Sequence, residues 1–143
     1  MGTYINKGNN AFRNIVRQEY VDKTSLMPLI NATIDTESRY SCVTRCRRFG
    51  KSMAAKMLCA YYDKSCSSRE LFRGLKAEQD SSFETYLNQY SVLYLDVTSF
   101  TARPELRRNI VWAMQDKIIC ELKEAFPDVK YRENSDLMDV LSA

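Results

Sequence analysis

Hydrophobic positions along this chain form two kinds of pattern, short apolar runs and longer stretches with helical spacing. The short runs are Tyr40–Thr44 and Val92–Val97, which are rich in β-branched and aromatic residues and predict buried strands. Helical spacing predicts an amphipathic helix over Glu105–Phe126 and a largely buried helix over Met53–Tyr62. Strand and helix patterns that alternate in this way predict an α/β fold, a parallel sheet flanked by helices.

Shorter helices are predicted from capping residues and helix breakers. A helix over Leu26–Asn31 is expected, with Ser25 as its N-cap and Pro28 in its first turn. A second short helix is expected over Ser81–Gln89, with Ser82 as its N-cap. Neither internal repeats nor low-complexity tracts interrupt the pattern, so residues 1–143 are expected to form a single domain.

Composition excludes several kinds of chemistry. The chain has no histidine, which removes histidine-based nucleophilic and acid–base catalysis. Its five cysteines contain no CxxC pair, so a structural zinc site is not expected. The cysteines are expected to be reduced thiols in the core. No uncharged stretch approaches the roughly 18 residues that a membrane helix needs, and no signal-peptide pattern opens the chain. A cytoplasmic protein without membrane contacts is expected.

Positive charge is concentrated in one part of the chain. The formal net charge is +3, yet Ser38–Tyr62 holds six basic residues and no acidic one, so all other residues together are net acidic. The six are Arg39, Arg45, Arg47, Arg48, Lys51 and Lys56. Such a local excess of positive charge indicates an anionic ligand at that place.

The strongest chemical signal is the sequence RCRRFGKS at residues 45–52, between the predicted strand and the predicted helix. It fits the phosphate-loop (Walker A) pattern G-x-x-x-x-G-K-[ST] except at the first glycine, which is Arg45. In that pattern backbone amides surround the phosphates, the lysine reaches the outer phosphates, and the hydroxyl binds magnesium. We therefore expect ATP with Mg²⁺ as the ligand, Lys51 as the catalytic cation, and Ser52 as a metal ligand.

The other residues of the loop have expected roles that follow from their chemistry. Gly50 permits close approach of the backbone to phosphate, at the start of a helix whose dipole favours anions. Arg47 and Arg48 can clamp phosphate oxygens, because a guanidinium group binds them with two parallel hydrogen bonds. Which of the two arginines points inward stays open. Phe49 is expected to pack under the loop, with stacking on a base as the alternative.

Four segments together resemble the N-terminal part of the AAA-ATPase-like family of bacterial and archaeal proteins. In chain order they are YVDKT at 20–24, TRCRRFGKS at 44–52, LFRGLK at 71–76 and YSVLYLDV at 90–97. The family's loop usually reads T-R-P-R-R-F-G-K-[ST], so the arginine at position 45 is a family trait and Cys46 in place of proline is a departure. The resemblance implies a P-loop ATPase-type domain.

The same resemblance implies what surrounds this domain. Longer members often carry a nuclease-like domain of the PD-(D/E)XK type, through which nucleic acid becomes a possible partner. The family's acidic Walker B strand follows the segment that corresponds to Val92–Val97, and no such sequence occurs before Ala143. The chain is therefore expected to be an N-terminal portion, and its hydrolysis of ATP is left open. Asp96 is the internal substitute for a magnesium ligand, with a turn or cap role as the alternative.

The same residues also fit other functions. The basic residues around the loop could contact nucleic-acid backbone phosphates, or the loop could serve as the helix cap of a degenerate, non-hydrolytic regulatory fold. Tyr20 and Asp22 are expected to anchor the segment before the first helix, with adenine recognition as the alternative. Glu105 and Glu121 are expected at solvated helix positions.

Overall fold

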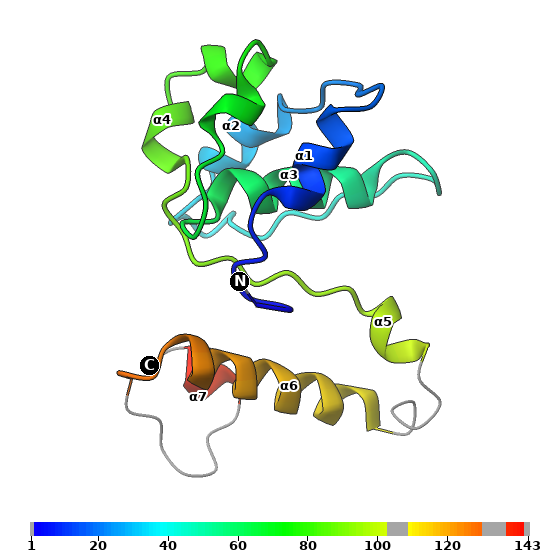
Figure 1. The fold of residues 1–143 in the computed structure, drawn as a ribbon, viewed down its shortest axis with the longest axis vertical. Helices are drawn as coiled ribbons and strands as arrows, with labels where there is room; N and C mark the ends of the chain where they lie inside the picture. The colour runs from blue at the N-terminus through cyan, green and yellow to red at the C-terminus, as the bar shows by residue number, and fades with distance from the viewer. Residues whose placement is uncertain (1, 103–108, 130–136, 142–143) are drawn as a thin grey trace. The chain divides into compact units, whose positions relative to one another are not determined.

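The computed structural model describes residues 2–102, 109–129 and 137–141, which divide into two compact units. The larger unit is Asn6–Val92, coloured blue to green in Figure 1. The smaller unit combines residues 2–5 with the described residues from Leu93 onward. The expectation of a single domain over residues 1–143 stays a prediction. Each unit is a group of residues that pack with one another, and this grouping does not test the number of domains.

Helices and turns make up the larger unit. In chain order they are α1 (Asn10–Val16), α2 (Leu26–Asn31), α3 (Lys51–Tyr62), the 3-10 helices η1 (Arg69–Phe72) and η2 (Lys76–Gln79), and α4 (Phe83–Tyr86). The predicted bounds of α2 are confirmed, and α3 begins two residues before its predicted start. Of the helix expected over Ser81–Gln89, only the four residues of α4 are helical. Neither Ser25 nor Ser82 makes a side-chain capping bond.

An aromatic cluster forms the core of the larger unit. The ring of Tyr61, on α3, lies 5.4 Å from that of Phe83 and 5.7 Å from that of Phe72, centroid to centroid. The Tyr61 hydroxyl donates a hydrogen bond to the carbonyl of Phe83 at 2.8 Å and accepts one from the Asn31 side-chain amide at 3.1 Å. These contacts hold the C-terminal half of α3 in the core, and α3 in turn positions the loop at its N-terminus.

The smaller unit is built around one long helix. It contains α5 (Thr98–Thr101), α6 (Ile110–Ala125) and α7 (Leu137–Leu141). The amphipathic helix predicted over Glu105–Phe126 is confirmed as α6, although Glu105 itself lies outside the described residues. Ile118 and Leu122 of α6 pack with Ile5 and Val140. No helix in the described ranges, α6 included, is both long enough and apolar enough to cross a lipid bilayer.

Glu121, on α6, has a structural role that the sequence did not indicate. Its carboxylate accepts hydrogen bonds from the backbone amides of Tyr4 and Ile5, at 2.8 and 2.9 Å through Oε1. The expectation of a solvated position is therefore wrong. A carboxylate on a helix surface satisfies the amides of a distant segment, which helical periodicity alone does not reveal.

The prediction of an α/β fold with a parallel sheet is wrong for the part of the chain that the structure describes. That part contains no strand and only two isolated bridges, Ile5 with Leu93 and Asp63 with Tyr90. No strand arrow is drawn in Figure 1. The described chain is helical with extended connections, so the sheet that was expected to precede and flank the phosphate loop is not part of it.

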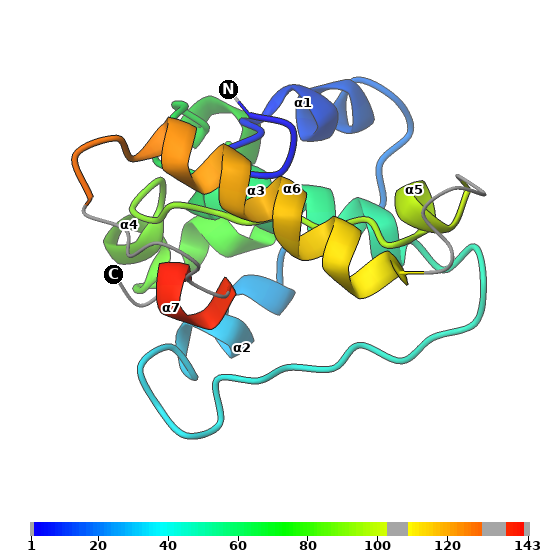
Figure 2. The ribbon, with the colours of Figure 1, turned by 90° about the horizontal axis from the view of Figure 1, so that it is seen from below.

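Both predicted strands are extended segments without the partners that a sheet needs. Tyr40–Thr44 belongs to the long open connection between α2 and α3 (Figure 2), where Tyr40 is 83% and Val43 is 49% exposed. In Val92–Val97, the Tyr94 amide donates to the Tyr4 carbonyl at 2.8 Å and the Val92 carbonyl accepts from the Asn6 amide at 2.9 Å, and these two bonds make the isolated Ile5–Leu93 bridge and not a ladder. A strand is stable only where neighbouring strands satisfy its backbone donors and acceptors. The β-propensity of these two segments was therefore not enough to predict a sheet.

Candidate functional site

The loop at residues 45–50 leads directly into α3 through two residues with left-handed backbone conformation. Arg48 has φ 67° and Gly50 has φ 77°, and glycine adopts this conformation at no steric cost. Gly50 is the N-cap of α3, and the first helical hydrogen bond runs from the Ala54 amide to the Gly50 carbonyl at 2.9 Å. The amides of Lys51, Ser52 and Met53 therefore have no acceptor within the helix and point toward the loop.

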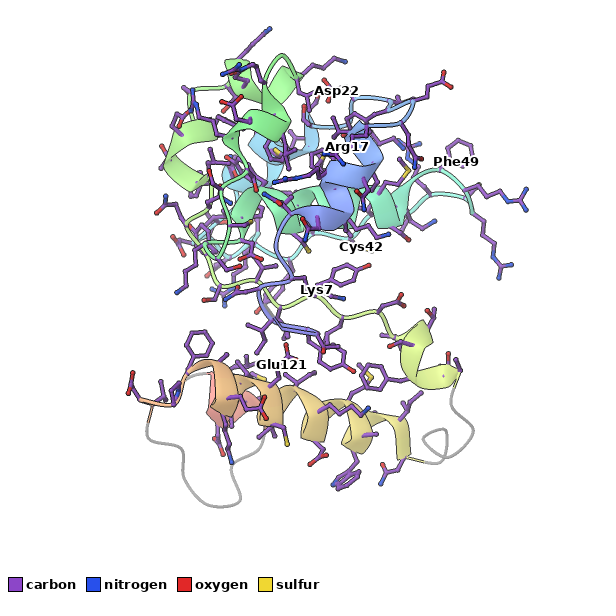
Figure 3. All side chains as sticks on the ribbon, in the orientation of Figure 1. Lys7, Arg17, Asp22, Cys42, Phe49 and Glu121 are labelled. Atoms are coloured by element: carbon purple, nitrogen blue, oxygen red, sulfur yellow. The ribbon has the colours of Figure 1, made fainter. Side chains whose placement is uncertain are left out.

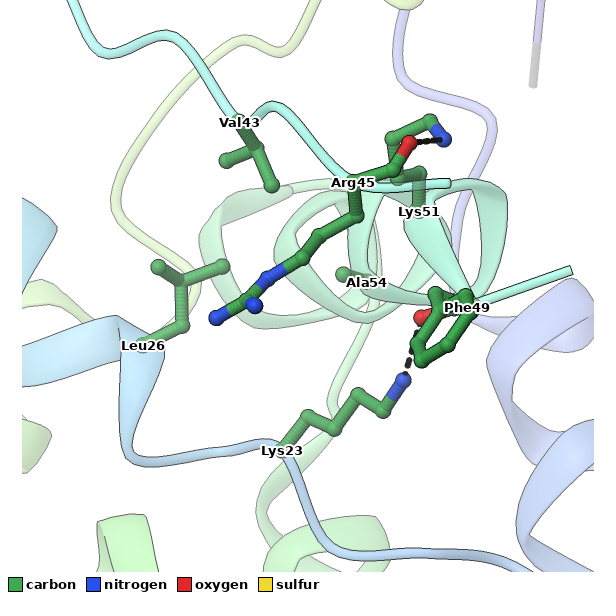
Figure 4. Close-up of a pocket in the computed structure, with 8 residues that line it drawn as sticks. Lys23, Leu26, Val43, Arg45, Phe49, Lys51 and Ala54 are labelled. Atoms are coloured by element: carbon green, nitrogen blue, oxygen red, sulfur yellow. Dashed lines mark hydrogen bonds between the residues drawn. The ribbon is translucent and has the colours of Figure 1, made fainter. Parts of the chain in front are cut away.

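A pocket of about 350 Å³ lies where the loop meets α3 (Figure 4). Its walls come from the turn before α2, the open connection, the loop and the first turns of α3. The lining residues are Lys23, Leu26, Val43, Arg45, Phe49, Gly50, Lys51 and Ala54. Three of these are cationic and none is acidic. The volume is at the small end of the range of about 300–1,000 Å³ that ligand pockets span.

Two lysine ammonium groups hold the loop through its carbonyl oxygens. Lys51 Nζ donates to the carbonyl of Arg45 at 2.5 Å and to that of Cys46 at 3.0 Å. Lys23 Nζ donates to the carbonyl of Phe49 at 2.6 Å, and Figure 4 shows it reaching the loop from a separate segment. Both lysines line the pocket, and both ammonium groups make these bonds at exposed positions.

The structure brings only some of the predicted site residues together. Gly50, Lys51 and Phe49 line the pocket, whereas Arg47 and Arg48 are exposed and Ser52 is exposed in the first turn of α3, all three outside the lining. Phe49 is 61% exposed, and Figure 3 shows its side chain on the outside of the loop. The expectation that Phe49 packs under the loop is therefore wrong. The roles of these residues toward a ligand stay predictions.

Comparison with known families agrees with the resemblance carried by the four sequence segments. The family model described as Predicted AAA-ATPase matches residues 7–142. This chain belongs to that family. No curated protein and no solved structure is similar enough to the chain to count as a match. The Predicted AAA-ATPase description supports an ATPase-like function in general terms, and the match includes the loop, α3 and the turn that carries Lys23.

Lys23 is a cation of the pocket that sequence reasoning missed. It lies in the YVDKT segment at 20–24, one of the segments through which the chain resembles the Predicted AAA-ATPase family. The segment is therefore recognisable from the sequence, but the roles predicted within it concern the neighbouring Tyr20 and Asp22. Nothing in the local pattern indicates that this lysine reaches a loop 26 residues away.

The turn around Asp22 is a compact hydrogen-bonded structure. Asp22 Oδ1 accepts from the Thr24 amide and hydroxyl at 2.8 and 2.7 Å, and Oδ2 accepts from the Lys76 amide at 2.9 Å. The buried Thr24 hydroxyl also accepts from the Ala77 amide at 3.0 Å. The Tyr20 hydroxyl accepts from the Lys23 amide at 3.3 Å. The anchoring role expected of Tyr20 and Asp22 is thus confirmed.

Replacement of Asp22 with asparagine should destabilise the larger unit at neutral pH and have little effect in acid. Burial alone would raise the pKa of Asp22, but the hydrogen bonds from Thr24 and the Lys76 amide together hold it below its usual 3.8. Stability from a lowered pKa is present above the unfolded-state pKa and is lost as the pH falls through the folded-state pKa. At pH 7 we expect a loss of about 1–2 kcal/mol in the free energy of unfolding.

Urea denaturation of wild type and Asp22→Asn at pH 7, 5 and 3 measures this effect. The difference between the two proteins should narrow below about pH 4, where the wild-type carboxylate takes up a proton. Glu37→Gln is the matched control, because Glu37 is exposed and should change the free energy of unfolding by less than about 0.5 kcal/mol. A difference that stays constant across the three pH values contradicts the role given to the ionised carboxylate.

The predicted magnesium ligands Ser52 and Asp96 belong to different units. Asp96 Oδ1 accepts from the Thr98 amide at 3.0 Å and from the Thr98 hydroxyl at 2.6 Å, so it forms a turn just before α5, whose N-cap is Val97. The strand that suggested a metal role for Asp96 is not formed. Within the ranges that the structure describes, no three His, Cys, Asp or Glu side chains gather in a way that could hold a metal ion.

The five cysteines differ in their exposure. All five are free thiols. Cys42, Cys46 and Cys120 are exposed, so the expectation of core thiols is wrong for these three. Cys59, on α3, is partly buried, and burial raises its pKa to about 11, which makes the thiolate scarce at neutral pH.

Proposed function

We propose that this chain binds a nucleoside triphosphate, ATP above all, with the phosphates in the pocket at the start of α3. The observation that carries the proposal is the lining of that pocket. Lys23, Arg45 and Lys51 contribute three cations, the lining contains no acidic residue, and Gly50 and Lys51 at the start of α3 form part of it. Cations that share a small pocket repel one another unless an anion neutralises them, so the ligand best suited to this lining is a polyanion.

Two physical effects add up for a phosphate chain at this place. The free amides of the first turn of α3 donate hydrogen bonds, and the helix dipole places partial positive charge there. Lys51 then supplies a full charge next to the same amides. The membership in the Predicted AAA-ATPase family supports ATP as the nucleotide.

Magnesium enters this proposal together with the nucleotide. Mg²⁺ in nucleotide sites takes many of its oxygen ligands from the phosphates and from water, and the protein supplies only one or two. The hydroxyl of Ser52, in the first turn of α3, is one such ligand. Bound magnesium would neutralise phosphate charge, and hydrolysis would require in addition a group that orients water.

Isothermal titration of the chain with Mg·ATP tests the proposal. We expect saturable binding to one site that weakens in the order ATP, ADP, AMP, because each phosphate removed takes away charge that the three cations attract. Binding should also weaken between 50 and 200 mM NaCl, since the pocket is open to solvent and its charges are screened. Absence of binding at millimolar Mg·ATP would contradict the proposal.

Nucleic-acid binding is the second candidate, favoured by the exposure of Arg47 and Arg48 outside the pocket. Exposed arginines can contact backbone phosphates, and such binding falls steeply with salt. A salt-titrated gel shift with Arg47→Ala and Lys51→Ala separates the candidates. If nucleic acid is the ligand, Arg47→Ala should weaken the shift at least as much as Lys51→Ala does. Added ATP should then have no effect on the shift.

A further inference from the structure

Lys23 reaches the phosphate loop from a turn that holds its backbone in place on both sides. Asp22 and Thr24, its two neighbours, are tied by hydrogen bonds to each other and to the amides of Lys76 and Ala77. Thr24 is fully buried. The long side chain of Lys23 therefore extends from a fixed origin, and less conformational entropy is lost when its ammonium group binds a ligand.

The approach of Lys23 to the loop is close. Its Nζ lies 2.6 Å from the carbonyl oxygen of Phe49, and a Cβ built on Gly50 would stand 2.5 Å from the same nitrogen. The absence of a side chain at Gly50 thus gives room for the Lys23 ammonium group as well as for the left-handed backbone. Glycine at position 50 serves both the loop and this contact.

Lys23 and Lys51 approach the pocket from different parts of the chain. Figure 4 shows Lys51 bonded to the carbonyl of Arg45 and Lys23 bonded to the carbonyl of Phe49, at separate points along the loop. An ammonium group has three N–H donors, and Lys23 gives one of them to Phe49. The remaining donors can serve a ligand without loss of the contact that shapes the loop.

We propose that Lys23 is a second phosphate-binding cation of this site, which acts together with Lys51 and makes the site selective for di- and triphosphates over monophosphates. This inference rests on the proposed function. A single cation and the helix amides suffice for one phosphate group, whereas a second ammonium group from a separate segment can contact the next phosphate along the chain. The turn around Asp22 and Thr24 positions Lys23 and does not itself touch the nucleotide.

The alternative for Lys23 is a purely structural role as the anchor of the loop. An anchor would affect every nucleotide alike, because it acts through the loop conformation. A phosphate ligand affects ATP and ADP more than AMP, and its effect grows with the charge of the nucleotide. The dependence on the number of phosphates therefore distinguishes the two roles.

The test measures the dissociation constants of ATP, ADP and AMP, with Mg²⁺ present, for wild type, Lys23→Met and Lys23→Arg. Lys23→Met keeps the length of the side chain and removes the charge. We expect it to weaken ATP binding about 10- to 100-fold, the range of a hydrogen bond to a charged group, and to weaken AMP binding less than about 3-fold. Lys23→Arg, which retains the charge, should recover most of the ATP affinity.

Lys56→Met is the matched control, since Lys56 is an exposed lysine of α3 outside the pocket lining, and its ATP affinity should equal that of wild type. Melting curves without nucleotide confirm that each variant is folded. If Lys23→Met does not fold, Lys23→Gln replaces it with the same expectations.

Two results overturn the inference while the proposed function stands. One is an unchanged ATP affinity of Lys23→Met, and the other is an equal loss for ATP, ADP and AMP. Failure of the wild type to bind any of the three nucleotides has a different meaning, because it overturns the proposed function itself.

Discussion

Lys51→Ala should remove most of the thermal stabilisation that Mg·ATP confers on the wild-type chain. At a concentration of 100 times its Kd, a ligand of the native state adds about 2.7 kcal/mol, which raises the melting temperature of a chain of this size by about 5–10 °C. Loss of the Lys51 ammonium group removes charged hydrogen bonds to phosphate and weakens binding about 100-fold. At the same ATP concentration the variant is then only half saturated, and its melting temperature rises by about 1 °C.

Lys56→Ala is the control for this experiment. Lys56 lies on the same helix as Lys51, is exposed and does not line the pocket, so the stabilisation by Mg·ATP should equal that of wild type. Without nucleotide, Lys51→Ala should melt close to wild type, because the bonds of Lys51 to the carbonyls of Arg45 and Cys46 are exposed to solvent. If Lys51→Ala retains the full stabilisation by ATP, the phosphates bind elsewhere.

Tyr61→Ala should lower the free energy of unfolding of the chain by about 4 kcal/mol. Truncation of a fully buried aromatic side chain costs about 3–5 kcal/mol through lost burial and the cavity that remains. Here the ring also contacts Phe72 and Phe83, and its hydroxyl serves the Phe83 carbonyl and the Asn31 amide. Because total stabilities are about 5–15 kcal/mol, such a loss removes a large share of the whole.

Two variants separate the contributions of Tyr61. Tyr61→Phe keeps the ring and removes the hydroxyl, at a cost of about 0.5–1.5 kcal/mol, because the Phe83 carbonyl loses one hydrogen bond and still accepts one from the Leu87 amide at 3.2 Å. Tyr40→Ala is the exposed control and should change the free energy of unfolding by less than about 0.5 kcal/mol, since Tyr40 is 83% exposed. Urea denaturation gives all three values, and an equal effect of Tyr61→Ala and Tyr40→Ala would contradict the core described for the larger unit.

The helices of this protein could be predicted because their hydrogen bonds are local. Leu26–Asn31 was expected from a cap and a proline, and the apolar residues of Met53–Tyr62 identified most of α3. A helix satisfies its own backbone over a few residues, so the pattern of a short window carries most of the information. The same reasoning found α6 from its apolar steps alone.

The strands could not be predicted in this way because a strand depends on distant partners. Tyr40–Thr44 and Val92–Val97 have the composition of strands, but a ladder exists only where another segment lies alongside. The buried polar contacts have the same origin. Asp63, for example, is fully buried and accepts a hydrogen bond from the Gly8 amide at 2.6 Å, across 55 residues of sequence.

The chemical character of the site follows from the residues alone: Gly50 at the start of α3, Lys51 beside it, and an excess of positive charge around both. Which cations line the pocket depends on how the chain folds, since Lys23 and Arg45 line it while Arg47 and Arg48 do not. The difference arises from the range of the interactions. A loop that continues into a helix is a local structure, whereas the position of Lys23 depends on hydrogen bonds from its turn to the backbone around Lys76.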